Sequence, residues 1–350
     1  MHAALLRRIN IQRSDQLSKI NINSKTNFFC IGDSKGFLQV INYPKIEAQS
    51  QPINREESYS QKQNCFQYII NEHHKGSINL ITWNICFNKL TTVGTDGSLV
   101  VWKKKNEVFI TEMVNKREDN DKSLITDVKW SKDGEYICFV YDDGQIYTGL
   151  VDGNHEWFNE LEKGLNFVEF SPDNKKILIA KRKANIYIFT VSGQQIGVIN
   201  LGEPFNDYDI VSIDWWCDYR KYNNKLEKLD KENNNTLDNN NNNEDDEILI
   251  DDNKNINEND FNSFKKHLMI AFKNGYILFF EDENDNEPIS TQSELTKIMG
   301  AQWEPKGRFY IVVGNINDSK GDNKSVNNGK AIALFYNIER ELIKKNSLPK

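Results

Sequence analysis

The residues of this sequence with the clearest chemical potential are His74, Thr92, Asp96 and Trp102, which lie in one short stretch. A histidine beside a carboxylate can act as a general base, and hydroxyl and indole groups can hydrogen-bond to either partner. The surrounding sequence indicates no nucleophile to accompany them, and no P-loop, HExxH or GxGxxG motif occurs. We therefore predict a buried structural network here, no catalytic residues and no enzyme activity.

These four residues belong to or border a repeating unit whose clearest copy is Gly76–Trp102. Two apolar strands end at Trp83 and Val93, and a third runs back to Trp102 after a hairpin at Thr95-Asp96-Gly97, where glycine supplies the positive φ of a tight turn. The aromatic residue that ends the first strand recurs along the chain at Trp83, Trp130, Phe170, Trp215 and Trp303, with Ile22 as a weaker copy. The first three spacings, 47, 40 and 45 residues, match four-stranded blades. The sequence predicts an all-β propeller of WD40 type with six recognisable blades and no seventh.

The repeat favours one propeller domain over residues 1–350, with a polar insertion from about Tyr219 to Phe264 inside the fifth blade. This insertion holds too little apolar surface to offset its ordering entropy, so we predict that it is disordered. Its core, Glu227–Asp260, carries a net charge of −9, which leaves +2 for the rest of a chain whose total is −7. We also predict that Ala3–Ile11 forms a strand pairing with the last blade. The fourth-blade hairpin has Ala184 or Asn185 in place of a turn glycine, so its turn has the weakest sequence signal.

Other candidate sites favour solvated or structural roles. His73 and His74 with Cys65 lack the further ligands of a zinc site, and Asp282–Glu287 lacks the glycine of a calcium loop. The basic clusters Lys103–Lys105 and Lys181–Lys183 flank strands without interleaved aromatics, so we predict a solvated rim and no nucleic-acid partner. The five cysteines show no CxxC pairing, as in reduced cytosolic proteins. We predict no metal, no cofactor and no membrane span.

Three runs of residues go beyond a generic propeller, and they begin at Asn79, Val128 and Ala271: NLITWNICFNKLTTVGTDGSLVVW, VKWSKDGEYICFVYDDGQIYTGLVDGNHEW and AFKNGYILFFEDENDNEP. Together they resemble the amino-terminal propeller of a WD-repeat subunit family of intraflagellar transport complex A. The resemblance covers most of Leu17–Leu348, although Ile22 stands where the family has its first anchor tryptophan.

The resemblance implies a cytoplasmic scaffold of the cilium or flagellum and the basal body, which binds the other complex A subunits in retrograde transport and cargo trafficking. The family's second propeller, helical solenoid and seventh blade have no counterpart here, and six blades leave two open sheet edges. We therefore expect an incompletely closed ring. The alternative is a generic WD40 adaptor of another assembly, such as a vesicle coat or a ubiquitin ligase. The partner-binding residues are unknown at this level.

Overall fold

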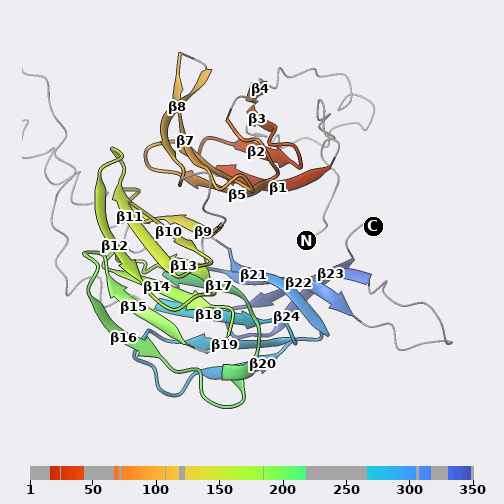
Figure 1. Ribbon diagram of the computed structural model, residues 1–350. Coiled ribbons are helices and arrows are strands. Elements are labelled where there is room, and N and C mark those ends of the chain that lie inside the picture. Colours follow the sequence, from red (N-terminus) through yellow and green to blue (C-terminus); the bar gives the residue numbers. More distant parts are fainter. Residues whose placement is uncertain are drawn as a thin grey trace, which may run out of the picture. The chain divides into compact units, whose positions relative to one another are not determined.

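The computed structural model describes residues 16–23, 25–42, 67–70, 73–106, 108–117, 123–183, 185–217, 266–304, 307–316 and 330–347. Within these ranges the chain is all β, apart from one 3-10 turn at Phe205–Asp207. The strands form six antiparallel sheets of four strands each, and every sheet is a meander in chain order (Figure 1). This confirms the predicted all-β propeller with six blades, and the described residues contain no seventh sheet.

The chain divides into two compact units, Met1–Val168 and Glu169–Lys350. The first unit holds three sheets. They are β1 (Leu17–Asn23), β2 (Phe28–Asp33), β3 (Leu38–Asn42) and β4 (Gln67–Ile70); then β5 (Ile78–Asn84), β6 (Lys89–Gly94), β7 (Leu99–Lys105) and β8 (Val108–Asn115); then β9 (Ile125–Trp130), β10 (Tyr136–Tyr141), β11 (Gln145–Leu150) and β12 (His155–Glu160).

The second unit holds the other three sheets, the first of which starts with a strand that crosses the unit boundary. They are β13 (Leu165–Phe170), β14 (Lys176–Lys181), β15 (Ile186–Thr190) and β16 (Gln195–Ile199); then β17 (Ile210–Cys217), β18 (Lys266–Phe272), β19 (Tyr276–Phe280) and β20 (Ile289–Gln292); then β21 (Lys297–Trp303), β22 (Phe309–Ile316), β23 (Lys330–Asn337) and β24 (Leu342–Ser347). The prediction of one domain over the whole chain stays a prediction.

The second sheet shows how the local sequence sets the strands. β5 and β6 pair from Ile78 to Asn84, with a bulge between Ile78 and Leu80. The hairpin between β6 and β7 turns at Gly97, whose φ of 76° is a conformation that side-chain-bearing residues rarely adopt. The turn between β5 and β6 likewise uses Asn88 at a φ of 51°, which asparagine tolerates better than most residues. The hairpin at Gly97 lies where the sequence predicts it.

The anchor aromatic of one sheet packs on the sheet before it. In the first unit, Trp83 of β5 stacks on Phe28 of β2 with ring centroids 6.1 Å apart and an interplanar angle of 19°. Phe109 of β8 meets both rings edge-on. Burying large aromatic side chains contributes more to such an interface than any single hydrogen bond. The periodic anchor predicted from the sequence is therefore the residue that joins consecutive sheets.

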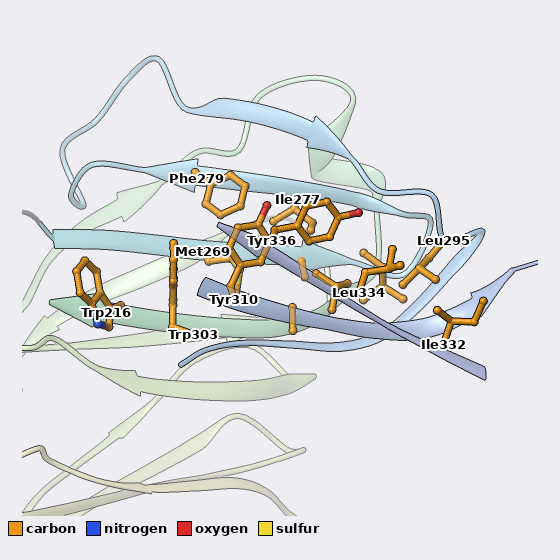
Figure 2. Packing of buried hydrophobic residues seen from close by; sticks show 14 residues of the cluster. Trp216, Met269, Ile277, Phe279, Leu295, Trp303, Tyr310, Ile332, Leu334 and Tyr336 are labelled. Atoms are coloured by element: carbon orange, nitrogen blue, oxygen red, sulfur yellow. The ribbon is translucent and has the colours of Figure 1, made fainter. Parts of the chain in front are cut away.

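The second unit repeats this packing between its last two sheets, as Figure 2 shows. Trp303 of β21 lies against Phe279 of β19 at 6.2 Å and against Trp216 of β17 at 5.7 Å. Next to Trp303, Tyr310 of β22 stacks on Tyr336 of β23 with an interplanar angle of 12°. The core of this unit thus lies between sheets, as in a propeller.

Several predictions fall outside the described residues: the strand at Ala3–Ile11, the insertion at Tyr219–Phe264, and Ala184 in the fourth-blade turn. On either side of that turn β14 and β15 pair in regular register, from Lys176 opposite Thr190 to Ala180 opposite Ile186. β17 and β18, on either side of the insertion, also pair directly. Among the described residues, no helix has the length and apolar character needed to cross a membrane.

Candidate functional site: a buried polar network in the second sheet

The four residues singled out in the sequence meet in the second sheet. His74 lies just before β5, Thr92 lies in the middle of β6, Asp96 occupies the β6–β7 hairpin, and Trp102 lies on β7. In the β6–β7 register, Trp102 is opposite Leu90 and Val100 is opposite Thr92, so Trp102 and Thr92 lie two residue pairs apart on the same face of the sheet. The hairpin therefore brings side chains from three segments to one point.

The hydroxyl of Thr92 is the centre of the network. The indole Nε1–H of Trp102 donates to Thr92 Oγ1 at 2.9 Å, and Thr92 Oγ1 lies 2.8 Å from His74 Nε2. Because the hydroxyl already accepts the indole hydrogen, its own hydrogen is available to the imidazole. His74 Nε2 then acts as an acceptor, so the ring hydrogen resides on Nδ1.

A fifth residue, Ser98, completes the chain of hydrogen bonds and was missed by the sequence reasoning. Its hydroxyl donates to Asp96 Oδ1 at 2.7 Å and lies 2.9 Å from His74 Nδ1, whereas the direct distance from His74 Nδ1 to Asp96 Oδ1 is 3.5 Å. Since an ionised carboxylate only accepts, His74 Nδ1–H donates to Ser98 Oγ. Ser98 therefore bridges the histidine and the aspartate. Its place two residues after the turn aspartate was the available signal.

The electrostatics agree with this assignment of hydrogens. Burial lowers the pKa of His74 by more than the neighbouring Asp96 raises it, so the imidazole is neutral near pH 7. Burial also tends to raise the pKa of Asp96. Hydrogen bonds from the backbone N–H of Lys75 and from Ser98 outweigh that effect, and the net pKa lies below its usual value. The network thus combines a neutral histidine with an ionised aspartate.

The same atoms bear on catalysis. Sequence reasoning found no nucleophile, yet the structure places the Thr92 hydroxyl against His74 in a triad-like position. Thr92 and the His74 side chain are both 0% exposed, and the hydroxyl also holds the Trp102 indole. No substrate can reach an oxygen buried in this way. The arrangement can orient and satisfy buried groups, but it cannot attack a substrate.

A second motif was overlooked in the sequence: Gly32-Asp33-Ser34-Lys35-Gly36 matches the G-x-S-x-G pattern of hydrolase nucleophiles. That chemistry needs a sharp turn from a strand into a helix. Here the motif spans the β2–β3 hairpin, where Asp33 Oδ1 accepts the backbone N–H groups of Lys35 and Phe37 at 2.8 and 2.9 Å. The motif is a strand-to-strand turn with no nucleophile elbow.

The third sheet fills the equivalent hairpin with a different pair. Asp143, at the position of Asp96, forms an ion pair with Arg117 Nη1 at 2.7 Å. The guanidinium also lies 3.5 Å from the centroid of the Tyr141 ring. Burial tends to raise the pKa of Asp143, but the bond from Arg117 and other hydrogen bonds hold it below its usual value. Sequence reasoning missed this pair, because Arg117 lies in a connection without periodic pattern.

The remaining sequence candidates that the structure describes lie in turns and at the ends of strands. His73 contacts the Thr111 hydroxyl at 2.7 Å, and Cys65 lies outside the described residues. No group of three or more His, Cys, Asp or Glu side chains suited to a metal ion occurs in the described part of the chain. The Asp282–Glu287 segment is a turn in which the carboxylates of Asp282 and Asp285 accept hydrogen bonds from backbone N–H groups of the same segment. In the basic clusters, Lys103 pairs with Glu112 at 3.6 Å, and Lys183 lies 3.8 Å from Asp209.

Comparison with known proteins decides the family. The profile of the WDR35/TULP4 N-terminal β-propeller family matches residues 1–263 of this chain. The chain belongs to this family. Human WD repeat-containing protein 35 is 32% identical over 312 residues, which cover 89% of this chain and 23% of the human protein. Mouse Tubby-related protein 4 is 24% identical over 276 residues, which cover 77% of this chain and 16% of that protein.

The WDR35/TULP4 relatives are therefore much longer than the part they share with this chain, which spans about a quarter of the human WD repeat-containing protein 35. Among solved structures, a chain of the crystal structure of the mitotic checkpoint complex matches with a TM-score of 0.55 and 8% identity. That match covers 85% of this chain and 71% of the solved chain. At this identity the likeness concerns the fold alone.

Proposed function

We propose that this protein is a subunit-binding scaffold of intraflagellar transport complex A that acts in retrograde transport at the cilium or flagellum and its basal body. Membership of the WDR35/TULP4 propeller family supports the broader role of a protein-interaction scaffold. The observation that carries the narrower proposal is the 32% identity with human WD repeat-containing protein 35 over 89% of this chain. The aligned part of this chain also contains the three sequence runs that resemble the complex A subunit family.

The second sheet supports a binding role over a catalytic one. The histidine, threonine and aspartate that could do acid–base chemistry are held in the network around Thr92, whereas its outermost strand β8 presents Val108, Ile110 and Val114 to solvent. An exposed apolar edge strand offers both side chains and backbone groups that a protein partner can cover. The exposed edge of this sheet is therefore suited to binding a protein partner.

A pull-down with the full chain tests the proposal. The tagged protein is immobilised and incubated with purified complex A subunits, and an unrelated propeller of the same fold serves as the control for non-specific capture. We expect recovery of at least one complex A subunit by this chain and none by the control. A fluorescent fusion should accumulate at the basal body and cilium.

Failure to recover any complex A subunit would overturn the narrower proposal. Recovery of components of a vesicle coat or a ubiquitin ligase in the same experiment would favour the generic adaptor, which shares the fold and not the partners. An Ile110→Thr variant adds a finer test, because it keeps a β-branched side chain at an exposed position while removing apolar surface. We expect weaker capture by this variant if β8 forms part of the interface.

A further inference from the structure

The second unit contains a basic pocket that none of the roles above explains. Its volume is about 410 Å³, within the range of roughly 300 to 1,000 Å³ that ligand sites usually occupy. Three lysines line it: Lys183 between β14 and β15, Lys273 in the β18–β19 turn, and Lys297 at the start of β21. They come from three consecutive sheets of the second unit. Sequence reasoning assigned only Lys183 to a basic cluster, and interpreted that cluster as a solvated rim.

Asp209 lies between two of these lysines but does not neutralise the pocket. Lys183 Nζ is 3.8 Å from one carboxylate oxygen of Asp209, and Lys273 Nζ is 3.8 Å from the other. Both distances exceed those of a charged hydrogen bond, and both lysine side chains are more than half exposed. With Asp207 and Lys297 counted, the lining keeps an excess of one positive charge.

The backbone beneath the pocket is tied together across the three sheets. The Ile210 N–H donates to the carbonyl of Arg182 at 2.7 Å, which joins the fifth sheet to the fourth, and the Ile298 N–H donates to the carbonyl of Lys273 at 2.9 Å, which joins the sixth sheet to the fifth. On one side, Tyr208 stacks on Tyr276 with ring centroids 5.7 Å apart and an interplanar angle of 27°. The lysine stems therefore project from a rigid base, which reduces the ordering cost of binding.

The corresponding hairpin of the second sheet is closed to ligands. There the turn aspartate, Asp96, is engaged by Ser98 and Lys75 in the buried network. In the fifth sheet the same turn reads Lys273-Asn274-Gly275, and both Lys273 and Asn274 line the pocket instead of sealing it. Because Asn274 takes the place of Asp96 and Lys273 precedes it, the turn of the fifth sheet presents a basic and an amide side chain at the surface.

We propose that this pocket binds the carboxylate of one acidic side chain, Asp or Glu, presented by a segment of a partner protein. A single carboxylate matches an excess of one positive charge, and the amide of Asn274 can add a hydrogen bond. Asp207 and Asp209 would repel the higher charge of a phosphate group. Three lysines also fall short of the four to eight, approximately, that anionic membrane recognition requires. The site refines the scaffold function by assigning a partner chemistry to one surface.

The test measures the fluorescence anisotropy of a labelled peptide of alternating Glu and Ala on titration with the full chain. Peptide binding should weaken about threefold in each single variant, Lys183→Gln, Lys273→Gln or Lys297→Gln, and by tenfold or more in the triple variant. Added salt should strongly weaken the binding of the peptide to the wild type. The matched control replaces Lys25, Lys132 and Lys175 by Gln. These three lysines are also exposed, but they lie in the turns between the first and second strands of their sheets and do not line the pocket. Circular dichroism checks that both triple variants stay folded.

Two results would overturn the proposal. One is equal affinity of the two triple variants for the Glu-Ala peptide. The other is tighter binding of a phosphoserine-Ala peptide, or of phosphatidylserine vesicles, than of the Glu-Ala peptide. The complex A pull-down uses folded subunits and a separate readout. A failure of the pocket proposal can therefore be distinguished from a failure of the proposed scaffold function.

Discussion

Replacing Thr92 by valine tests the buried network most directly, because valine keeps the shape of threonine while removing its hydroxyl. That hydroxyl bonds to His74 Nε2 at 2.8 Å and to Trp102 Nε1 at 2.9 Å, and Thr92 is 0% exposed. Each buried group left without a partner costs about 1 to 3 kcal/mol. Two groups lose their partner, so we expect Thr92→Val to lower the free energy of unfolding by about 2 to 6 kcal/mol.

Urea denaturation followed by circular dichroism measures this loss as a lower midpoint at unchanged slope. Thr92→Ser keeps the hydroxyl and should cost only about 1 kcal/mol for the lost methyl group. Thr82→Val is the matched control, since Thr82 is only partly buried on β5, and it should stay within about 0.5 kcal/mol of the wild type. A Thr92→Val protein as stable as the Thr82→Val protein would refute the hydrogen-bond reasoning.

Two further predictions concern the same network. Burial holds the pKa of folded His74 below 6.5, so the unfolded chain takes up the proton first as the pH falls. The stability that the neutral His74 contributes is therefore complete above about pH 6.5, and it decreases below that pH by at most about 1.4 kcal/mol per pH unit. A His74→Gln variant, measured by urea denaturation from about pH 7.5 to 5.5, should lack this decrease in stability. A wild type and variant with the same pH dependence would contradict the burial of a neutral imidazole. Gly94→Ala should destabilise by about 1 to 3 kcal/mol, because its Cβ would lie 2.4 Å from Asp96 Oδ1 and 2.6 Å from His74 Nδ1. An unchanged urea midpoint for Gly94→Ala would argue against this tight packing.

Much of the architecture follows from local sequence patterns. The hairpin at Gly97 and the anchor positions of Trp83 and Trp303 were predictable, because turn geometry and strand alternation depend on residues close together in the chain. The recurrence of one unit multiplies that local signal along the chain. Four of the five network residues were found for the same reason, since the repeat fixes where a hairpin aspartate and its partners fall.

The sequence by itself thus determined the β class, the blade period and most of the polar network of this protein. Only the tertiary structure decided that Ser98 bridges His74 and Asp96. It also decided that lysines as distant in sequence as Lys183 and Lys297 converge on one pocket. The physical reason is range. Strands and turns are set by neighbours in the chain, whereas burial and charge clustering depend on which sheets pack side by side.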